Sequence, residues 1–152
     1  MSKEKKQTQP KKTRKQKSPN LRNKAFTFRI DPTEKQIGKL EWTLRRCKEL
    51  SNAALQERRD AYKMCGVSVS YYTQNKQLPE IKEIREEYRD IHSQVLQDVL
   101  TRVDKAMDNF FRRVKNGEKA GYPRFESGDR YDSFTSTQLD FIHITQQKRA
   151  SP

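Results

Sequence analysis

The sequence predicts a mainly α-helical protein with a few short β-strands, an α+β fold, behind a disordered basic tail. Two long segments, residues 34–64 and 93–115, repeat apolar residues at the three- and four-residue steps of amphipathic helices. Residues 25–30 alternate apolar and polar side chains as a half-buried strand does. Residues 1–23 are polar and basic, with too few apolar side chains to offset the entropy of ordering.

Positive charge is concentrated at the N-terminus. Residues 1–24 hold ten Lys or Arg and a single acid, Glu4, which is +9 of the formal net charge of +13. This surplus, with a pI near 9.9, favours a polyanionic partner, most commonly nucleic acid and less often an anionic membrane surface. Two interpretations of the tail stay open: an arm that grips phosphates nonspecifically, or an expendable solubilising leader.

Several other classes of protein are not expected. No segment approaches the ~18 apolar residues of a membrane span, and no apolar run follows the basic N-terminus as in a secretory signal. Cys47 and Cys65 fit no disulfide framework, so we expect free thiols in a reducing cytoplasm. We therefore expect a cytoplasmic protein without membrane association or a small-molecule substrate.

The predicted first strand and first helix meet at a capping motif. Asp31-Pro32 ends the strand, and Thr33 and Gln36 have the spacing of a capping box. The helix is expected over residues 34–64, with Gly66 as its stop. Its apolar stripe consists of Ile37, Leu40, Leu44, Cys47, Leu50, Ala54 and Ala61.

Short helices and a second long helix follow. Ser70 predicts a cap for a helix over residues 71–76, and Pro79 is expected to break it before another turn or two. The helix over residues 93–115 has the broadest apolar face and ends at Asn116-Gly117. That face consists of Val95, Leu96, Val99, Leu100, Val103, Ala106, Met107, Phe110, Phe111 and Val114. Residues 131–135 and 139–144 are predicted strands, which need packed helices or additional strands to be stable.

Catalytic and metal chemistry have little support in the sequence. His92 and His143 stand alone and the cysteines lack ligand spacing, so neither a metal site nor a cofactor is expected. No candidate nucleophile has a supporting base motif, and no phosphate-binding loop of the Walker type is present.

Basic and aromatic residues interleave where the second long helix ends. Arg and Lys neutralise phosphates, and the rings of residues such as Tyr122 and Phe125 can stack on bases, so the pattern favours nucleic-acid binding. The alternative is a solvated basic surface whose aromatic side chains pack on the core. The cations concerned are Arg112, Arg113, Lys115, Lys119 and Arg124.

Five segments, in this order and spacing, resemble the N-terminal region of the TnpB/OrfB proteins of bacterial insertion sequences, a region labelled a transposase helix-turn-helix domain. The resemblance covers residues 24–135, and the long helix with its GYPRF sequel is its most specific part. The segments are KAFTFRIDPTEKQ at 24–36, SYYTQNKQLPEIK at 70–82, HSQVLQDVLTRVDKAMDNFFRR at 92–113, NGEKAGYPRF at 116–125 and RYDSFT at 130–135.

The resemblance implies an architecture and a set of contacts. Residues 25–30 would begin a small, incomplete β-barrel, the helices would form an inserted lobe, and residues 130–135 would return to the barrel. Proteins of this family bind a guide RNA and, through it, target DNA, with basic residues holding the backbones. The implied phosphate contacts are Arg112, Arg113, Lys115, Lys119 and Arg124 first, and Arg45, Arg46, Arg58 and Arg59 second.

Residues 136–152 no longer resemble the family, whose RuvC-like nuclease and zinc ribbon lie beyond the matching part. We therefore expect a truncated, non-catalytic, nucleic-acid-binding fragment, since two-metal cleavage needs acidic metal ligands. The alternatives are a non-functional remnant of a truncated transposase gene, a helical protein-interaction domain and, despite the missing part, an active nuclease.

Overall fold

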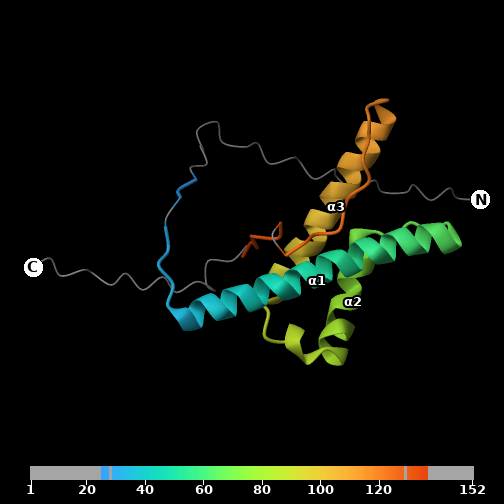
Figure 1. Ribbon diagram of the computed structural model, residues 1–152. Coiled ribbons are helices and arrows are strands. Elements are labelled where there is room, and N and C mark those ends of the chain that lie inside the picture. Colours follow the sequence, from blue (N-terminus) through green and yellow to red (C-terminus); the bar gives the residue numbers. More distant parts are fainter. Residues whose placement is uncertain (1–24, 28, 129, 137–152) are drawn as a thin grey trace, which may run out of the picture. The chain divides into compact units, whose positions relative to one another are not determined.

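The computed structural model describes residues 25–27, 29–128 and 130–136. Their contacts divide the chain into two units, residues 1–31 and 32–152, and each is considered by itself. The second unit contains α1 (Glu34–Cys65), α2 (Tyr71–Ile84), the 3₁₀ helix η1 (Glu86–Tyr88) and α3 (Ser93–Lys115). Helix α3 contacts both α1 and α2, so the core forms where the three helices meet (Figure 1).

Helix α1 begins and ends close to the predicted positions. The side-chain oxygen of Gln36 accepts a hydrogen bond from the backbone N–H of Thr33 at 2.8 Å. Gly66 ends the helix with a φ of 66°, in the left-handed region that glycine enters without a steric penalty. In the middle of the helix Cys47 is buried, and burial raises the pKa of its thiol to about 11. Cys65 is exposed, and both cysteines are free.

Helix α2 is continuous where two short helices were predicted. Its cap is as expected, because the Ser70 hydroxyl accepts a hydrogen bond from the Thr73 N–H at 3.3 Å. The predicted break is wrong, since the helix runs through Pro79. Proline inside a helix costs about 3 kcal/mol, but the neighbouring Leu78 is buried and Ile81 packs on the core. Packing on the other helices therefore outweighs the local preference.

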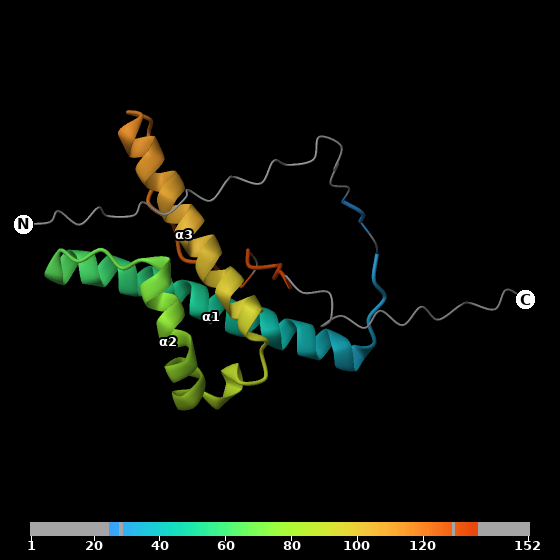
Figure 2. The same ribbon diagram turned by 180° about the vertical axis from the view of Figure 1, so that it is seen from behind.

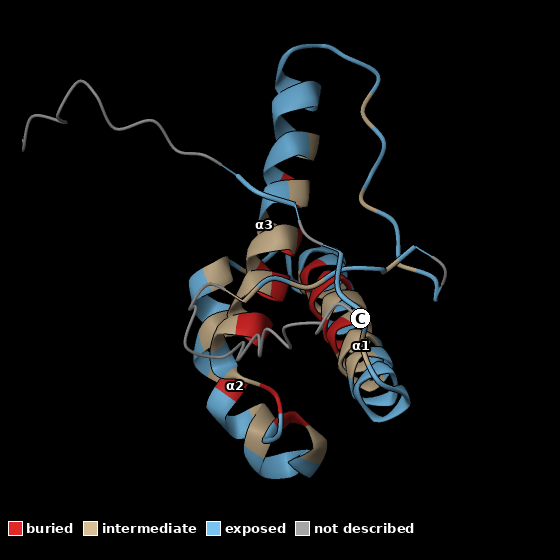
Figure 3. Ribbon diagram, turned by 90° about the vertical axis from the view of Figure 1, so that its left-hand side faces the viewer, coloured by how far each residue is buried: buried red, intermediate tan, exposed pale blue. Residues whose placement is uncertain are grey.

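Helix α3 has the predicted bounds, but only part of its apolar face is covered. From Val95 to Val103 the face is almost fully buried, and Met107 marks the end of the core. The same line continues to Phe111 and Val114, whose side chains are 56% and 53% exposed. Figure 3 shows this change along α3, from buried positions beside α1 to an exposed far end.

Residues 117–128 and 130–136, here called the return segment, run back from the end of α3 towards α1, as both views show (Figures 1 and 2). The Asn52 side chain holds the Glu126 backbone, accepting from its N–H at 2.8 Å and donating to its carbonyl at 3.0 Å. Arg102 donates to the Ser133 carbonyl at 2.9 Å and to the Thr135 hydroxyl at 2.7 Å. The segment is thus attached through side chains of α1 and α3.

The predicted α+β class, with its strands and incomplete β-barrel, is wrong for the residues that the structure describes, which form helices and irregular segments. No strand occurs at residues 25–30, of which Phe28 is outside the described part, or at residues 130–135. A strand needs a neighbouring backbone to complete its hydrogen bonds, whereas the return segment finds helix side chains instead. The predicted half-burial also fails, because Phe26 and Ile30 are exposed. Residues 1–24 and 139–144 lie outside the described residues.

Replacing Asn52 with Ala is expected to loosen the return segment. Two backbone groups of Glu126 lose their partners, which costs about 1–3 kcal/mol. A cost of this size corresponds to amide exchange that is roughly five- to 150-fold faster. Hydrogen exchange of a peptide spanning Glu126 measures the effect, with Ala53→Ser on the adjacent exposed position as the control. Unchanged exchange in the Asn52 variant would show that the clamp does not hold the segment.

Candidate nucleic-acid interface

Charge is distributed unevenly over the helical unit. Residues 32–109 contain fourteen Lys or Arg and thirteen Asp or Glu, a net charge of +1. Residues 110–125, here called the basic end, contain five bases and one acid, a net charge of +4. Outside the N-terminal segment, the positive surplus is therefore concentrated in one short stretch. Its five cations are Arg112, Arg113, Lys115, Lys119 and Arg124.

The cations of the basic end are accessible. All five are exposed, and none of them forms an ion pair within the part of the chain that the structure describes. The acid of this stretch, Glu118, accepts a hydrogen bond from the Asn116 side chain at 3.0 Å. Gly117, with a φ of 70°, lets the chain reverse after α3. These positive groups are therefore free to meet an external anion.

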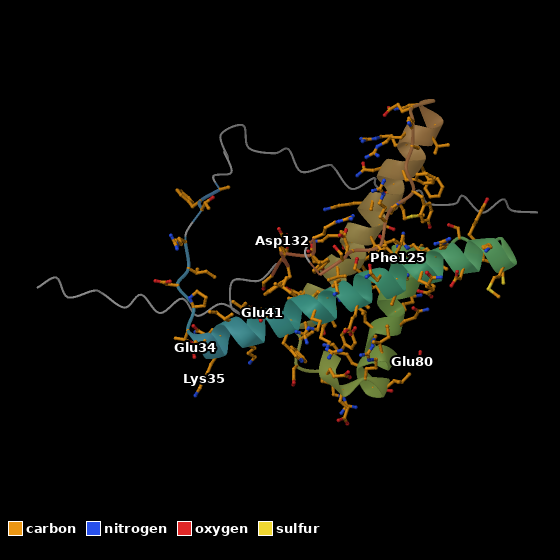
Figure 4. All side chains as sticks on the ribbon, viewed as in Figure 1. Glu34, Lys35, Glu41, Glu80, Phe125 and Asp132 are labelled. Atoms are coloured by element: carbon orange, nitrogen blue, oxygen red, sulfur yellow. The ribbon has the colours of Figure 1, made fainter. Side chains whose placement is uncertain are left out.

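Aromatic rings lie among these cations. The ring centroids of Phe110 and Phe111 are 5.2 Å apart, and those of Phe110 and Tyr122 are 5.3 Å apart, which links helix α3 to the return segment. Phe125 follows on the return segment, directly before Glu126, whose backbone is held by Asn52 of α1 (Figure 4). The exposed fractions of Tyr122 and Phe125 are 39% and 42%. The basic end therefore presents apolar rings as well as charge.

A groove of about 270 Å³ lies beside the basic end, between the return segment and helices α1 and α3. Arg102, Arg124 and Arg130 line it together with the acids Glu126 and Asp132. Arg102 is already engaged, because its Nε donates to Asp98 at 2.8 Å and its other nitrogens hold the return segment. The groove thus has mixed charge, and Arg124, which belongs to the basic end, and Arg130 form no ion pair among the described residues.

Arg58 lies inside the helical unit. One of its terminal nitrogens is 2.8 Å from an Asp104 oxygen, and its Nε donates to the Gln74 side chain at 2.8 Å. Gln74 in turn donates to the Ala54 carbonyl at 2.9 Å and to Glu57 at 2.8 Å. This network joins α1, α2 and α3, so we do not propose Arg58 as a phosphate contact.

The other second-rank arginines differ from one another. Arg46 is paired with Glu49 at 2.7 Å and lies 3.7 Å from Glu87, so its charge is already satisfied. Arg45 and Arg59 are exposed and have no ion-pair partner among the described residues. The structure therefore does not bring the four arginines of this second group together as one surface.

Three structural residues escaped the sequence reasoning, and two of them had a detectable signal. The apolar stripe of α1 has a seven-residue step from Ala54 to Ala61, and Arg58 fills the helical position between them. Gln74 likewise lies one turn before Leu78 on the inner face of α2. Asn52 had no such signal, because its partner is 74 positions away in the chain.

Comparison with known proteins identifies the class of the N-terminal part. Residues 20–66 match a helix-turn-helix domain, that of the OrfB/IS605 family. The chain thus carries an N-terminal helix-turn-helix region of the OrfB/IS605 transposase type, which confirms the resemblance over this segment. Within the described part of the match α1 is the one helix, and α2 begins at Tyr71, beyond the end of the match at residue 66. No curated protein matches the chain.

Two further observations concern the described residues alone. They contain no group of three His, Cys, Asp or Glu side chains arranged to hold a metal ion. None of their helices combines the length and the apolar character that crossing a bilayer requires.

Proposed function

We propose that the chain binds nucleic acid through its basic end, with Arg112, Arg113, Lys115, Lys119 and Arg124 contacting backbone phosphates. One observation carries the proposal: residues 32–109 are nearly neutral, whereas residues 110–125 display five exposed cations that form no ion pair among the described residues. The helix-turn-helix match supports nucleic-acid binding by the chain, because such regions are non-catalytic DNA-binding elements; it covers residues 20–66 and does not include the basic end.

The finer features of the proposal come from the family resemblance. We include a guide RNA of the OrfB type among the strands to be tested, and we treat residues 24–135 as the functional unit. Phosphate contacts position a protein on a nucleic acid without reading its sequence. The basic end is therefore expected to bind backbones of different sequence with similar affinity.

Reversing the charge at Arg112 and Arg113 tests the proposal. Arg112→Glu with Arg113→Glu is expected to lower the affinity of the full chain for a DNA or RNA strand at least about tenfold near 0.1 M salt. The slope of log affinity against log salt should fall by about one for each phosphate that the variant no longer neutralises. Anisotropy titrations over a salt series measure both quantities.

The matched control is Lys76→Glu with Lys105→Glu, which makes the same change in net charge outside both the basic end and the matched residues 20–66. Both lysines are exposed, Lys76 on α2 and Lys105 on α3, and neither forms an ion pair among the described residues. This control is expected to retain most of the affinity. An equal loss in the two variants would mean that total charge, and not the basic end, determines binding.

A further inference from the structure

We infer that the basic end takes an unpaired strand of nucleic acid, with the rings of Phe111, Tyr122 and Phe125 stacking on its bases. The inference rests on the proposed function and deepens it, because it names the form of the strand. The cations around the rings meet the phosphates of the same strand.

Part of the apolar surface of α3 is uncovered. The inner line of α3 leaves the core after Met107, and Phe111 is 56% exposed although it continues that line. A single exposed ring is ordinary on a protein surface. Here three exposed rings lie within fifteen residues, and Phe111 and Tyr122 are joined through the ring of Phe110. Such a group of apolar side chains marks an interaction site.

The charge around the rings indicates the chemical class of the partner. The same stretch carries five exposed cations and one acid, whereas the centres of protein–protein interfaces are poor in charged residues, Lys above all. Lys115 follows Phe111 by four positions, so the ammonium group and the ring lie on the same side of α3. Rings alternating with cations match a polymer of flat bases and phosphates. The charge therefore points to nucleic acid as the occupant.

The exposed rings also distinguish an unpaired strand from a duplex. In a duplex the faces of the bases are stacked on one another, and only phosphates, sugars and groove edges are accessible. An unpaired strand exposes base faces, and each ring that stacks on one contributes to affinity without reading sequence. Exposed rings beside phosphate-binding cations are therefore useful for an unpaired strand and of little use for a duplex.

Abasic oligonucleotides separate stacking from charge. The full chain is titrated at one salt concentration with four anisotropy probes of equal length, about 15 nucleotides: single-stranded DNA, RNA of the same sequence, duplex DNA, and an abasic strand that keeps the phosphates. The normal DNA or RNA strand is expected to bind at least about tenfold more tightly than the abasic strand. Residues 1–24 contain no aromatic residue, so they cannot produce this difference by aromatic stacking.

Two variants assign the preference to the rings. Phe111→Leu with Phe125→Leu keeps the sites apolar and is expected to abolish most of the preference while leaving affinity for the abasic strand unchanged. The control, Tyr62→Leu with Tyr72→Leu, removes two rings that are 70% and 74% exposed elsewhere on the helical unit, and the preference should persist. Circular dichroism of each variant confirms that the helices remain.

The outcomes distinguish the inference from the function on which it rests. Equal, salt-dependent binding of normal and abasic strands would overturn the inference and leave the proposed function standing. Failure of the chain to bind any probe would overturn both. Self-association that Phe111→Leu abolishes, with the preference for a normal strand unchanged, would assign the rings to a second copy of the chain and also overturn the inference.

Discussion

Replacing Arg58 with Ala is expected to lower the free energy of unfolding by about 3 kcal/mol. The side chain of Arg58 is 5% exposed and ion-paired with Asp104. Its removal also leaves the buried Gln74 side chain without a donor. The side chain of Asp104 is 37% exposed, so water compensates part of the missing ion pair and the expected cost lies at the lower end of the range for buried pairs. Urea unfolding followed by circular dichroism measures the loss.

The neighbouring arginine provides the control for this prediction. Arg59 is exposed and has no ion-pair partner within the described residues. Arg59→Ala is therefore expected to change stability by no more than about 0.5 kcal/mol. Equal effects at Arg58 and Arg59 would contradict the assignment of Arg58 to a network that joins the three helices.

Replacing Leu100 with Ala is expected to cost about 3–4 kcal/mol of stability. Leu100 is 1% exposed at the point where α3 passes through the core, so truncation removes apolar packing and leaves a cavity that the packed helices fill only partly. The decrease is measured by the same urea titration. Because small helical domains are marginally stable, it represents a large share of the total.

The control lies on the same predicted apolar face, nearer the end of α3. Val114 is 53% exposed, so Val114→Ala is expected to cost less than about 0.5 kcal/mol. A loss at Val114 comparable to that at Leu100 would show that the far end of α3 is covered in the folded chain. The basic end would then not be an open surface.

The helices could be predicted because their signals are local. Apolar periodicity, the Thr33 cap and the terminal glycines mark the bounds of α1 and α3 closely, and the Ser70 cap marks the start of α2. The strands could not be judged in the same way, since alternation over residues 25–30 gives no information about a pairing partner. For α2, the break at Pro79 follows from local preference, whereas the burial of Leu78 depends on the rest of the fold.

The candidate site was predictable only in part. Arg112, Arg113, Lys115 and Lys119 lie at or just after the end of α3, so their grouping required no knowledge of the tertiary fold. Arg124 lies further along the return segment, where it lines the groove with residues of α1 and α3. Arg58 and Arg59 are adjacent arginines in the sequence. Their positions around the axis of α1 determine that Arg58 is buried and Arg59 is exposed. The exposure of Phe111 was not foreseen, because periodicity shows which face is apolar but not where the covering helices end.

Hydrogen exchange of the full chain, with and without a saturating single-stranded oligonucleotide, tests most directly whether nucleic acid binds at the accessible cations at the end of α3. Binding at the basic end is expected to slow amide exchange in peptides covering residues 110–125, with little change at the N-terminal turns of α1. Protection confined to residues 1–24, with exchange over residues 110–125 unaltered, would contradict the account and assign nucleic-acid binding to the N-terminal segment.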